Sequence, residues 1–427
     1  MGEKTNVGRK KPKLASRHGL IAALDIGTTK VCCFIARLDD DGNPRVVGIG
    51  HQISAGMRGG AIVDMEAAET AVLSAVHAAE QMANENIHEV VVNLSGGYPA
   101  SQTVGVEVLI NGHEVSDGDL RRVLEQGHLL DGNGERSLIH SIPVGYAIDG
   151  SRGIRDPRGM FGDRLGVDMH VVTAASGAIR NLTNCIGRCH LDIKSLVVSP
   201  YAAGLATLVD DERDLGVTVV DMGGGTTTVA VFFDGNVVYT DVVPIGGAHV
   251  TNDIARGLST PLAHAERMKT LYGNCMPSPS DEREMITVPL VGEEDLAQAN
   301  TVPKSILTGI IQPRLEETFE FVRERFEKSG FERLAGRRVV VTGGASQLQG
   351  VRELAALVLD KQIRMGRPLR VGGLAEATGG PAFATCAGLV VYAQQTADRP
   401  PLPASVGASE EPNGFVGRVG HWFRENF

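Results

Sequence analysis

The stretch DMGGGTTT, residues 221–228, and the shorter DIGTTK, residues 25–30, follow one pattern. Each places an aspartate where a predicted strand ends, then glycine and threonine in a turn that leads to another strand. Glycine lets backbone N–H groups approach an anion closely, and the threonine hydroxyls and Lys30 add donors. One such turn alone is typical of a tight β-hairpin. Two copies favour a polyphosphate held from both sides, with the carboxylates holding a hydrated Mg²⁺.

The two turns lie inside a longer repeat. Period-2 patterns predict strands at roughly 19–27, 30–38 and 45–54, which form a three-stranded meander. Residues 216–247 repeat this order of strands and turns about 198 residues later, which indicates two related domains. The chain contains neither GxxxxGK[ST] nor GxGxxG, so the commoner nucleotide-binding motifs are excluded.

Composition places the chain among ordinary globular proteins. Its 427 residues, 42% of them hydrophobic, suffice for roughly two to four domains. The net charge of −10 predicts no nucleic-acid partner. No apolar stretch approaches the ~20 residues of a transmembrane helix, and the start lacks the apolar core of a secretory signal, so we expect a cytoplasmic protein. The six cysteines form no disulfide pattern, and the pair Cys185 and Cys189 lacks further metal ligands.

The rest of the chain alternates helical and strand patterns. A helix is predicted over 65–83, and a buried strand, EVVVNLSG, begins at residue 89. Residues 100–175 are less regular and richer in polar turns, and we interpret them as a small inserted subdomain. The later helical patterns cover 246–258, 261–273, 303–330 and 379–395.

The stretch VTGGASQLQGV, residues 341–351, predicts a strand that runs into a Gly-Gly turn opening a helix. Such a turn could let adenine or ribose lie against bare backbone. It could equally be only the start of a helix, and the sequence leaves both interpretations open.

These residues resemble the superfamily of actin, Hsp70 and the sugar kinases, which has two phosphate loops and an adenosine loop in this order. Within it, LDIGTTKV, GAIVDMEAAE, PIGGAHVTNDIA, AERMK, IIQPRLEE and VVVTGGASQLQGV are most similar to the bacterial cell-division family FtsA. The resemblance implies an α/β, actin-like fold of two lobes, built from duplicated ribonuclease H-like domains. It also implies a small inserted subdomain called 1C and a C-terminal amphipathic helix.

The resemblance divides the chain into the segments named in this family. They are a disordered basic arm at 1–18, domain 1A at 19–99 and 176–212, domain 1C at 100–175, domain 2A at 213–257 and 329–396, domain 2B at 258–328, a flexible linker at 397–413 and a membrane-binding helix at 414–427.

The resemblance also implies a site for ATP and Mg²⁺. Its phosphate loops are Asp25, Gly27, Thr28, Thr29 and Lys30, and then Asp221, Gly223, Gly224, Gly225, Thr226 and Thr227. The adenosine loop is Gly343, Gly344, Ala345 and Ser346, and the pair near adenine and ribose is Glu266 and Lys269. Asp25 and Asp221 would hold the metal through water. An exposed helical ion pair is the alternative for Glu266 and Lys269, which lie three residues apart.

Two departures from related sequences bear on catalysis. Thr228 stands where many members of the superfamily have aspartate, and Ser199 stands where Hsp70-type chaperones have glutamate. A serine hydroxyl is a poor general base at neutral pH. We therefore assign no catalytic residue and expect at most a weak ATPase, in which nucleotide acts mainly as a structural and assembly ligand.

The stretch IIQPRLEETFEFVRERF, residues 310–326, carries a possible partner site. Arg314, and Lys304 upstream, match positions that resemble the docking site of FtsA for the acidic C-terminal peptide of FtsZ. Arg323 and Arg325 are instead typical of a solvated helix face.

The tail contains Trp422, the only tryptophan of the chain. On a helical wheel its apolar residues fall within one arc, which is typical of a helix that lies in a membrane interface. We expect the following residues to contact lipid: Phe415, Val416, Arg418, Val419, Trp422, Phe423 and Phe427. Docking of the tail onto the protein's own surface is the alternative.

For function, the resemblance implies an ATP-binding filament protein that tethers FtsZ to the cytoplasmic face of the inner membrane at the division septum. Self-association, lipid and later division proteins would be its other partners. A sugar or polyol kinase and an Hsp70-like ATPase are the alternatives on the same fold. A kinase needs a catalytic aspartate in a sugar pocket, for which we find no candidate, and a chaperone needs a β-rich peptide domain after the ATPase lobes.

Overall fold

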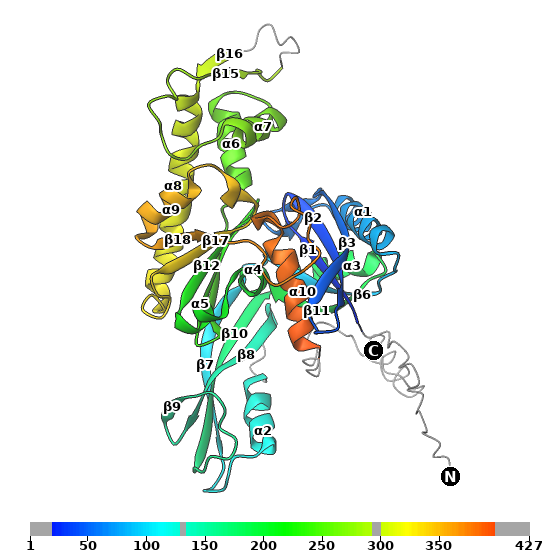
Figure 1. The fold of residues 1–427 in the computed structure, drawn as a ribbon, viewed down its shortest axis with the longest axis vertical. Helices are drawn as coiled ribbons and strands as arrows, with labels where there is room; N and C mark the ends of the chain where they lie inside the picture. Colours follow the sequence, from blue (N-terminus) through cyan, green and yellow to red (C-terminus); the bar gives the residue numbers. More distant parts are fainter. Residues whose placement is uncertain (1–18, 129–133, 293–299, 398–427) are drawn as a thin grey trace, which may run out of the picture.

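A computed structural model describes residues 19–128, 134–292 and 300–397, and Figure 1 shows its elements. The first lobe contains a five-stranded sheet in the order β11-β6-β1-β2-β3. As predicted, its first three strands form an antiparallel meander, and β6 and β11 add to it in parallel. The strands are β1 (Leu20–Ile26), β2 (Lys30–Leu38), β3 (Pro44–Ile53), β6 (Glu89–Leu94) and β11 (Asp192–Val198).

The second lobe repeats this topology. Its sheet has the order β14-β13-β12-β17-β18, again a meander extended by two parallel strands, so the predicted duplication is confirmed. Every residue of the central β12 is buried, because helices and neighbouring sheets cover both of its faces. The strands are β12 (Val217–Met222), β13 (Thr227–Phe233), β14 (Asn236–Val243), β17 (Arg338–Thr342) and β18 (Gln362–Met365).

Helices cover both faces of the first sheet. On one face, α1 (Met65–Ala83) and α3 (Ser176–Arg188) contribute alanine, valine and isoleucine to a common core with β1 and β6. Asp64 caps α1, since its carboxylate accepts a hydrogen bond from the N–H of Ala67 at 3.1 Å. The other face packs against α4 (Ser199–Thr207) and α10 (Ala384–Thr396).

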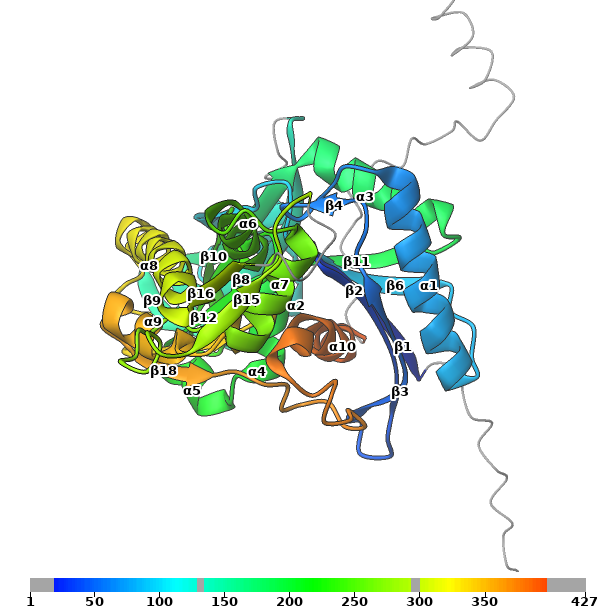
Figure 2. The ribbon, with the colours of Figure 1, turned by 90° about the horizontal axis from the view of Figure 1, so that it is seen from above.

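The helices α4 and α10 join the lobes. A β-carbon at Gly388 in α10 would lie 1.7 Å from the carbonyl oxygen of Ala202 in α4, so the two backbones cross in direct contact. Residues of α4 also pack under the second sheet, against Phe232. Although we grouped α10 with the second lobe, it lies against the first sheet, between the two lobes (Figure 2).

The described residues within 100–175 form a layer that projects from the body (Figure 1). The sequence pattern favours a small inserted subdomain here but predicts none of its strands. The segment is a four-stranded antiparallel sheet, β7-β10-β8-β9, with α2 packed on it. The elements are β7 (Ala100–Leu109), α2 (Asp117–His128), β8 (Arg136–Ile148), β9 (Ser151–Ile154) and β10 (Arg164–Ala175). Polar and glycine residues on the solvent-facing side of β7 weaken its apolar signal, which is why the pattern looked like turns.

The far end of the second lobe consists of helices and a hairpin. Its longest element, α8 (Lys304–Ser329), buries apolar residues spaced three and four apart, from Leu307 to Phe326. The others are α6 (Gly247–Gly257), α7 (Leu262–Tyr272), β15 (Met285–Val288) and β16 (Asn300–Pro303).

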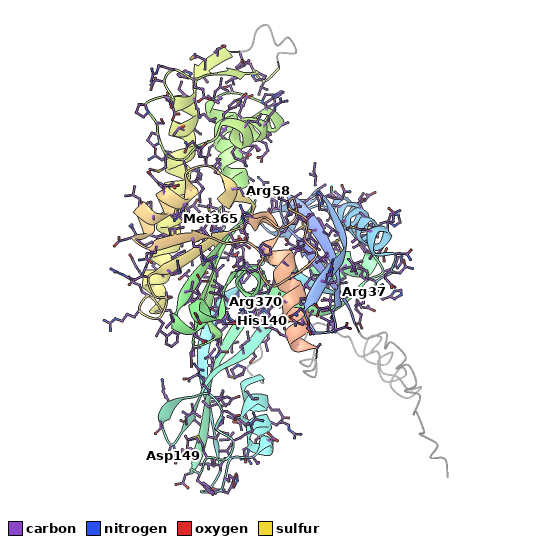
Figure 3. The ribbon with its side chains drawn as sticks, in the orientation of Figure 1. Arg37, Arg58, His140, Asp149, Met365 and Arg370 are labelled. Carbon is purple, nitrogen blue, oxygen red and sulfur yellow. The ribbon has the colours of Figure 1, made fainter. Side chains whose placement is uncertain are left out.

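A buried aromatic cluster joins the inserted sheet to the body. His140 of β8 lies beside α10 (Figure 3), with its ring 5.5 Å from that of Tyr201 and 6.1 Å from that of Tyr392. Its Nε2 accepts a hydrogen bond from the N–H of Val198 at 3.1 Å. Burial, with a smaller contribution from the neighbouring His170, lowers the pKa of His140 to about 3. Burial likewise lowers the pKa of His170 to about 4.

These histidines predict a loss of stability in acid. In the unfolded chain His140 binds a proton near pH 6.5, whereas in the folded protein it does so only near pH 3. The free energy of unfolding is therefore at its full value above pH 6.5 and decreases as the pH drops below it. Between pH 7.5 and 5, the titration of His140 should lower the free energy of unfolding by about 2 kcal/mol. In urea unfolding, the stability advantage of the parent chain over His140→Gln should shrink by that amount. His88→Gln, at an exposed position, is the control, and an advantage that is the same at both pH values would contradict the prediction.

Candidate functional site

The two predicted phosphate loops have the same internal geometry. The N–H of Gly27 donates to the carbonyl of Lys30 at 2.9 Å, and the N–H of Gly223 donates to the carbonyl of Thr226 at 2.9 Å. Each turn thus closes with one hydrogen bond between its first glycine and the residue three positions later. The duplication therefore extends from the sheets to the loops.

The loops also touch each other. A β-carbon at Gly225 would lie 2.3 Å from Oγ1 of Thr28, and one at Gly224 would lie 2.4 Å from Cγ2 of Thr29. Only glycine allows this approach, because any side chain would push the loops apart. The structure therefore brings together the threonines of the first loop and the glycines of the second.

Two carboxylates are buried beneath these loops. Asp25 and Asp221, at the ends of β1 and β12, are each 8% exposed. Burial raises the pKa of Asp25 to about 7; Lys30 opposes this shift, and Asp221 adds to it. Burial raises the pKa of Asp221 to about 6, against the opposing effects of a hydrogen bond from Thr385 and the charge of Lys30. Two buried carboxylates beside two glycine-rich turns suit a hydrated divalent cation and its phosphates.

The ammonium of Lys30 is held by a segment that the sequence interpretation did not include. It donates to the carbonyl of Ala382 at 2.6 Å and lies 3.3 Å from the centre of the Phe383 ring. Both residues belong to the 3₁₀ segment η3 (Pro381–Phe383), which precedes α10. No sequence motif identified these two residues, because they contact Lys30 through a backbone carbonyl and the face of an aromatic ring.

The predicted adenosine loop differs from the expected helix start. After β17, Gly343 takes a φ of +90°, and a 3₁₀ turn, η2 (Gly344–Gln347), follows it. The helix α9 (Val351–Leu359) begins only after this turn. Ser346 donates its hydroxyl to the carbonyl of Gly343 at 2.7 Å, so this side chain stabilises its own loop.

Glu266 and Lys269 form the helical ion pair that we considered, at 2.7 Å, but Lys269 makes further contacts. Its ammonium donates to the carbonyl of Gly247 at 3.1 Å and to the hydroxyl of Thr251 at 2.8 Å. A β-carbon at Gly247 would lie 3.1 Å from that of Ala345. The pair therefore lies where α6 begins, close to the predicted adenosine loop.

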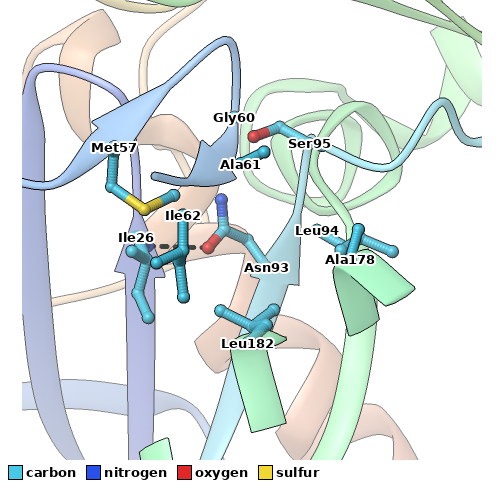
Figure 4. A pocket seen from close by; sticks show the side chains of 11 residues that line it. Ile26, Met57, Gly60, Ala61, Ile62, Asn93, Leu94, Ser95, Ala178 and Leu182 are labelled. Carbon is cyan, nitrogen blue, oxygen red and sulfur yellow. Dashed lines mark hydrogen bonds between the residues drawn. The ribbon is translucent and has the colours of Figure 1, made fainter. Parts of the chain in front are cut away.

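A small pocket lies behind the first phosphate loop, under the hairpin of β4 (Met57–Arg58) and β5 (Ala61–Ile62). Figure 4 shows Asn93 in its wall, with its Oδ1 accepting a hydrogen bond from the N–H of Ile26 at 2.7 Å. Its Nδ2 donates to the hydroxyl of Ser199 at 3.2 Å. The sequence interpretation missed Asn93, although an amide inside the apolar run EVVVNL was a signal.

Thr228 is buried, and its hydroxyl has no partner among the described residues.

The two residues expected to bind FtsZ lie on α8, and both already have acidic partners. Arg314 pairs with Asp253 at 2.5 Å and also with Glu317, and its side chain is 28% exposed. Lys304 pairs with Glu284 at 3.0 Å and is 14% exposed. Arg323 and Arg325, expected on a solvated face, are 49% and 43% exposed.

The tail residues that we expect to contact lipid, the linker and the basic arm lie outside the described residues. Within the ranges that the structure covers, no helix has the length and apolar character needed to cross a bilayer.

Solved structures with a similar fold define the class of protein. They include a PilM–PilN type IV pilus biogenesis complex, with a TM-score of 0.60 and 18% identity over 87% of this chain and 98% of that chain. MreB5 of Spiroplasma citri bound to ADP has a TM-score of 0.51 and 13% identity over 89% of this chain and 97% of that chain. With the duplicated sheets, these similarities define an actin-like, two-lobed α/β protein.

Sequence comparison gives the family. The family model "Cell division protein FtsA" matches residues 218–388, and "SHS2 domain inserted in FTSA" matches residues 96–173. FtsA of Rhizobium meliloti is 45% identical over 98% of this chain and 97% of that protein. For FtsA of Escherichia coli K12 the identity is 31%, over 97% of this chain and 99% of that protein. The chain belongs to the FtsA family of cell division proteins.

The buried carboxylates predict that Asp221→Asn stabilises the nucleotide-free protein. At pH 8 the change removes one of two buried ionised groups, and we expect the thermal midpoint to rise by about 2–4 °C. The gain should shrink as the pH falls below about 6 and disappear near pH 3.8, where the carboxylate of the unfolded parent chain is protonated as well. The matched control, Asp40→Asn, changes an exposed residue between β2 and β3 and should leave the midpoint unchanged. A lower midpoint for Asp221→Asn at pH 8 would show that the carboxylate stabilises the empty site.

Proposed function

We propose that the protein binds ATP with Mg²⁺, polymerises into actin-like filaments and attaches FtsZ to the cytoplasmic face of the inner membrane at the division septum. One observation carries the nucleotide part of this proposal. The two Gly-Thr turns meet face to face above Asp25 and Asp221, two buried carboxylates with raised pKa values. A nucleotide that enters between the turns has to separate them, so its binding is linked to the angle between the lobes.

Each part of the site has a separate role in this proposal. The N–H groups of the two turns and the hydroxyls of Thr28 and Thr29 would bind the phosphates. Asp25 and Asp221 would hold the water shell of Mg²⁺, which when bound supplies positive charge beside the phosphates. The loop 343–346 and the pair Glu266 and Lys269 would bind adenosine, since Lys269 already joins α6 to that side of the site.

Hydrolysis should be slow. The hydroxyl of Ser199 accepts a hydrogen bond from Asn93 and has little basicity with which to activate water. The position after the second turn holds Thr228 and not a carboxylate. We expect phosphate release from the purified protein well below one per second, and release at tens per second would contradict the assignment of nucleotide as an assembly ligand.

The FtsZ part of the proposal rests on Arg314. Its guanidinium is held between Asp253 and Glu317, so its planar fork is already orientated for a carboxylate. An acidic peptide would exchange with these partners or share the guanidinium with them.

Arg314→Glu should reduce capture of FtsZ by about tenfold or more, because the reversed charge repels an acidic peptide beside two existing carboxylates. A pull-down with purified FtsZ measures this. Arg323→Glu, on the exposed side of the same helix, is the matched control and should retain binding. ATP binding should be the same in all three proteins, and undiminished capture by Arg314→Glu would exclude Arg314 from the FtsZ site.

The membrane part of the proposal rests on the tail sequence. Its apolar arc around Trp422 and its arginines suit a helix at the surface of anionic lipid, and one such helix of 14 residues or fewer binds reversibly. A filament that displays many tails gains affinity through avidity. Attachment would therefore depend on polymerisation.

Trp422→Glu should abolish co-pelleting of the protein with phosphatidylglycerol-containing liposomes in the presence of Mg²⁺ and ATP. Ser409→Glu introduces the same charge in the linker and should leave co-pelleting unchanged. Persistent pelleting of Trp422→Glu would show that the tail does not hold the protein on lipid.

The alternative function, a sugar or polyol kinase, would be favoured if the parent chain phosphorylated a polyol.

A further inference from the structure

The segment from Pro381 to Thr385 contacts all three loops that we assign to nucleotide. The carbonyl of Pro381 accepts a hydrogen bond from the N–H of Gly343 at 3.2 Å, and that of Ala382 accepts one from Lys30 at 2.6 Å. The hydroxyl of Thr385 donates to Oδ2 of Asp221 at 2.9 Å. A short stretch of chain, outside every motif that we recognised, thus connects the adenosine loop and both phosphate loops.

The contact between Thr385 and Asp221 fixes the orientation of a buried carboxylate. Both residues are less than 10% exposed. While Oδ2 accepts the threonine hydroxyl, Oδ1 packs against bare backbone, since a β-carbon at Gly343 would lie 2.4 Å from it. The carboxylate is therefore restrained on both of its oxygens and has little freedom to rotate.

The hydroxyl of Thr385 does not make the local hydrogen bond that is usual for threonine in a helix. Such hydroxyls commonly donate to the carbonyl four residues earlier, as Thr396 does to Tyr392 at 2.8 Å in the same helix. For Thr385 that carbonyl belongs to Pro381, which instead accepts from Gly343 and Thr342. The hydroxyl is turned outwards, away from its own helix and towards the second lobe.

This hydrogen bond also crosses between the lobes. Thr385 lies in α10, which packs on the first sheet and crosses α4 at Gly388, whereas Asp221 ends the central strand of the second sheet. The position of the hydroxyl is set by one lobe and that of the carboxylate by the other. The carboxylate is correctly orientated only when the lobes have the separation seen in this structure.

We propose that Thr385 is a positioning residue of the nucleotide site, whose hydroxyl orients the Asp221 carboxylate towards the hydrated cation that accompanies the bound nucleotide. This inference rests on the nucleotide binding proposed above. Thr385 acts through Asp221, so its removal affects the part of the binding that depends on the cation. A residue that merely holds α10 in place would affect nucleotide binding with and without the cation alike.

The test compares the full-length parent chain with Thr385→Val and Thr385→Ser by titration calorimetry with ATP, once with Mg²⁺ and once with EDTA. Thr385→Val keeps the shape and removes the hydroxyl, and we expect it to weaken binding of Mg-ATP by about tenfold, the loss that corresponds to about 1.4 kcal/mol. Its affinity for ATP in EDTA should stay within about twofold of the parent value. Thr385→Ser keeps the donor and should restore most of the Mg-dependent affinity.

Thr396→Val, near the end of the same helix, is the matched control and should bind like the parent in both conditions. Equal losses for Thr385→Val with Mg²⁺ and with EDTA, or no loss in either, would overturn the inference and leave the proposed function intact. Failure of Thr385→Ser to recover the affinity would also overturn it. If the parent chain bound no ATP, both the proposed function and this inference would be wrong.

Discussion

The close approach of the two Gly-Thr turns is the constraint on which the rest of the structure depends. Gly224 and Gly225 lie against Thr28 and Thr29 with no room for a β-carbon. For the turns to meet in this way, both sheets must present the same edge towards the space between the lobes. Repeated topology supplies that arrangement, because each turn joins the first two strands of an equivalent meander. The aspartates that precede the turns are then buried together, and their raised pKa values follow from this burial.

The lobes are also joined by direct contact between backbones, where α10 crosses α4. Where α10 crosses α4, Gly388 lies directly on the carbonyl of Ala202, and Gly204 presses on the ring of Phe232. The two helices are therefore in direct backbone contact at this point, with no room for a side chain at residue 388. Hydrogen bonds at Pro381 and Thr385 connect the lobes nearer the site. The lobes are therefore joined by a compact apolar crossing and by hydrogen bonds that depend on their separation.

The sequence predicted the elements with strong local patterns. Both meanders, α1 and the long α8 have apolar residues at the period of their structure, and the structure confirms them. The inserted sheet was missed because the solvent-facing side of β7 carries polar residues and glycine. Within the site, the two turns were predicted from their glycines and aspartates. Asn93, Ala382, Phe383 and Thr385 were not, since their contacts join residues far apart in the chain and two of them act through backbone or ring.

The length of α8 has a mechanical consequence. Its 26 residues span about 39 Å, from the base of the second sheet to the tip that carries Lys304. A rotation of the second lobe by about 5° would displace the far end of a rod of this length by roughly 3 Å, whereas the atoms beside the pivot would hardly move. The same rotation therefore moves the tip of α8 much farther than its base. A small change in the gap between the two Gly-Thr turns would displace the tip of α8 far enough to alter which neighbouring molecule it can touch.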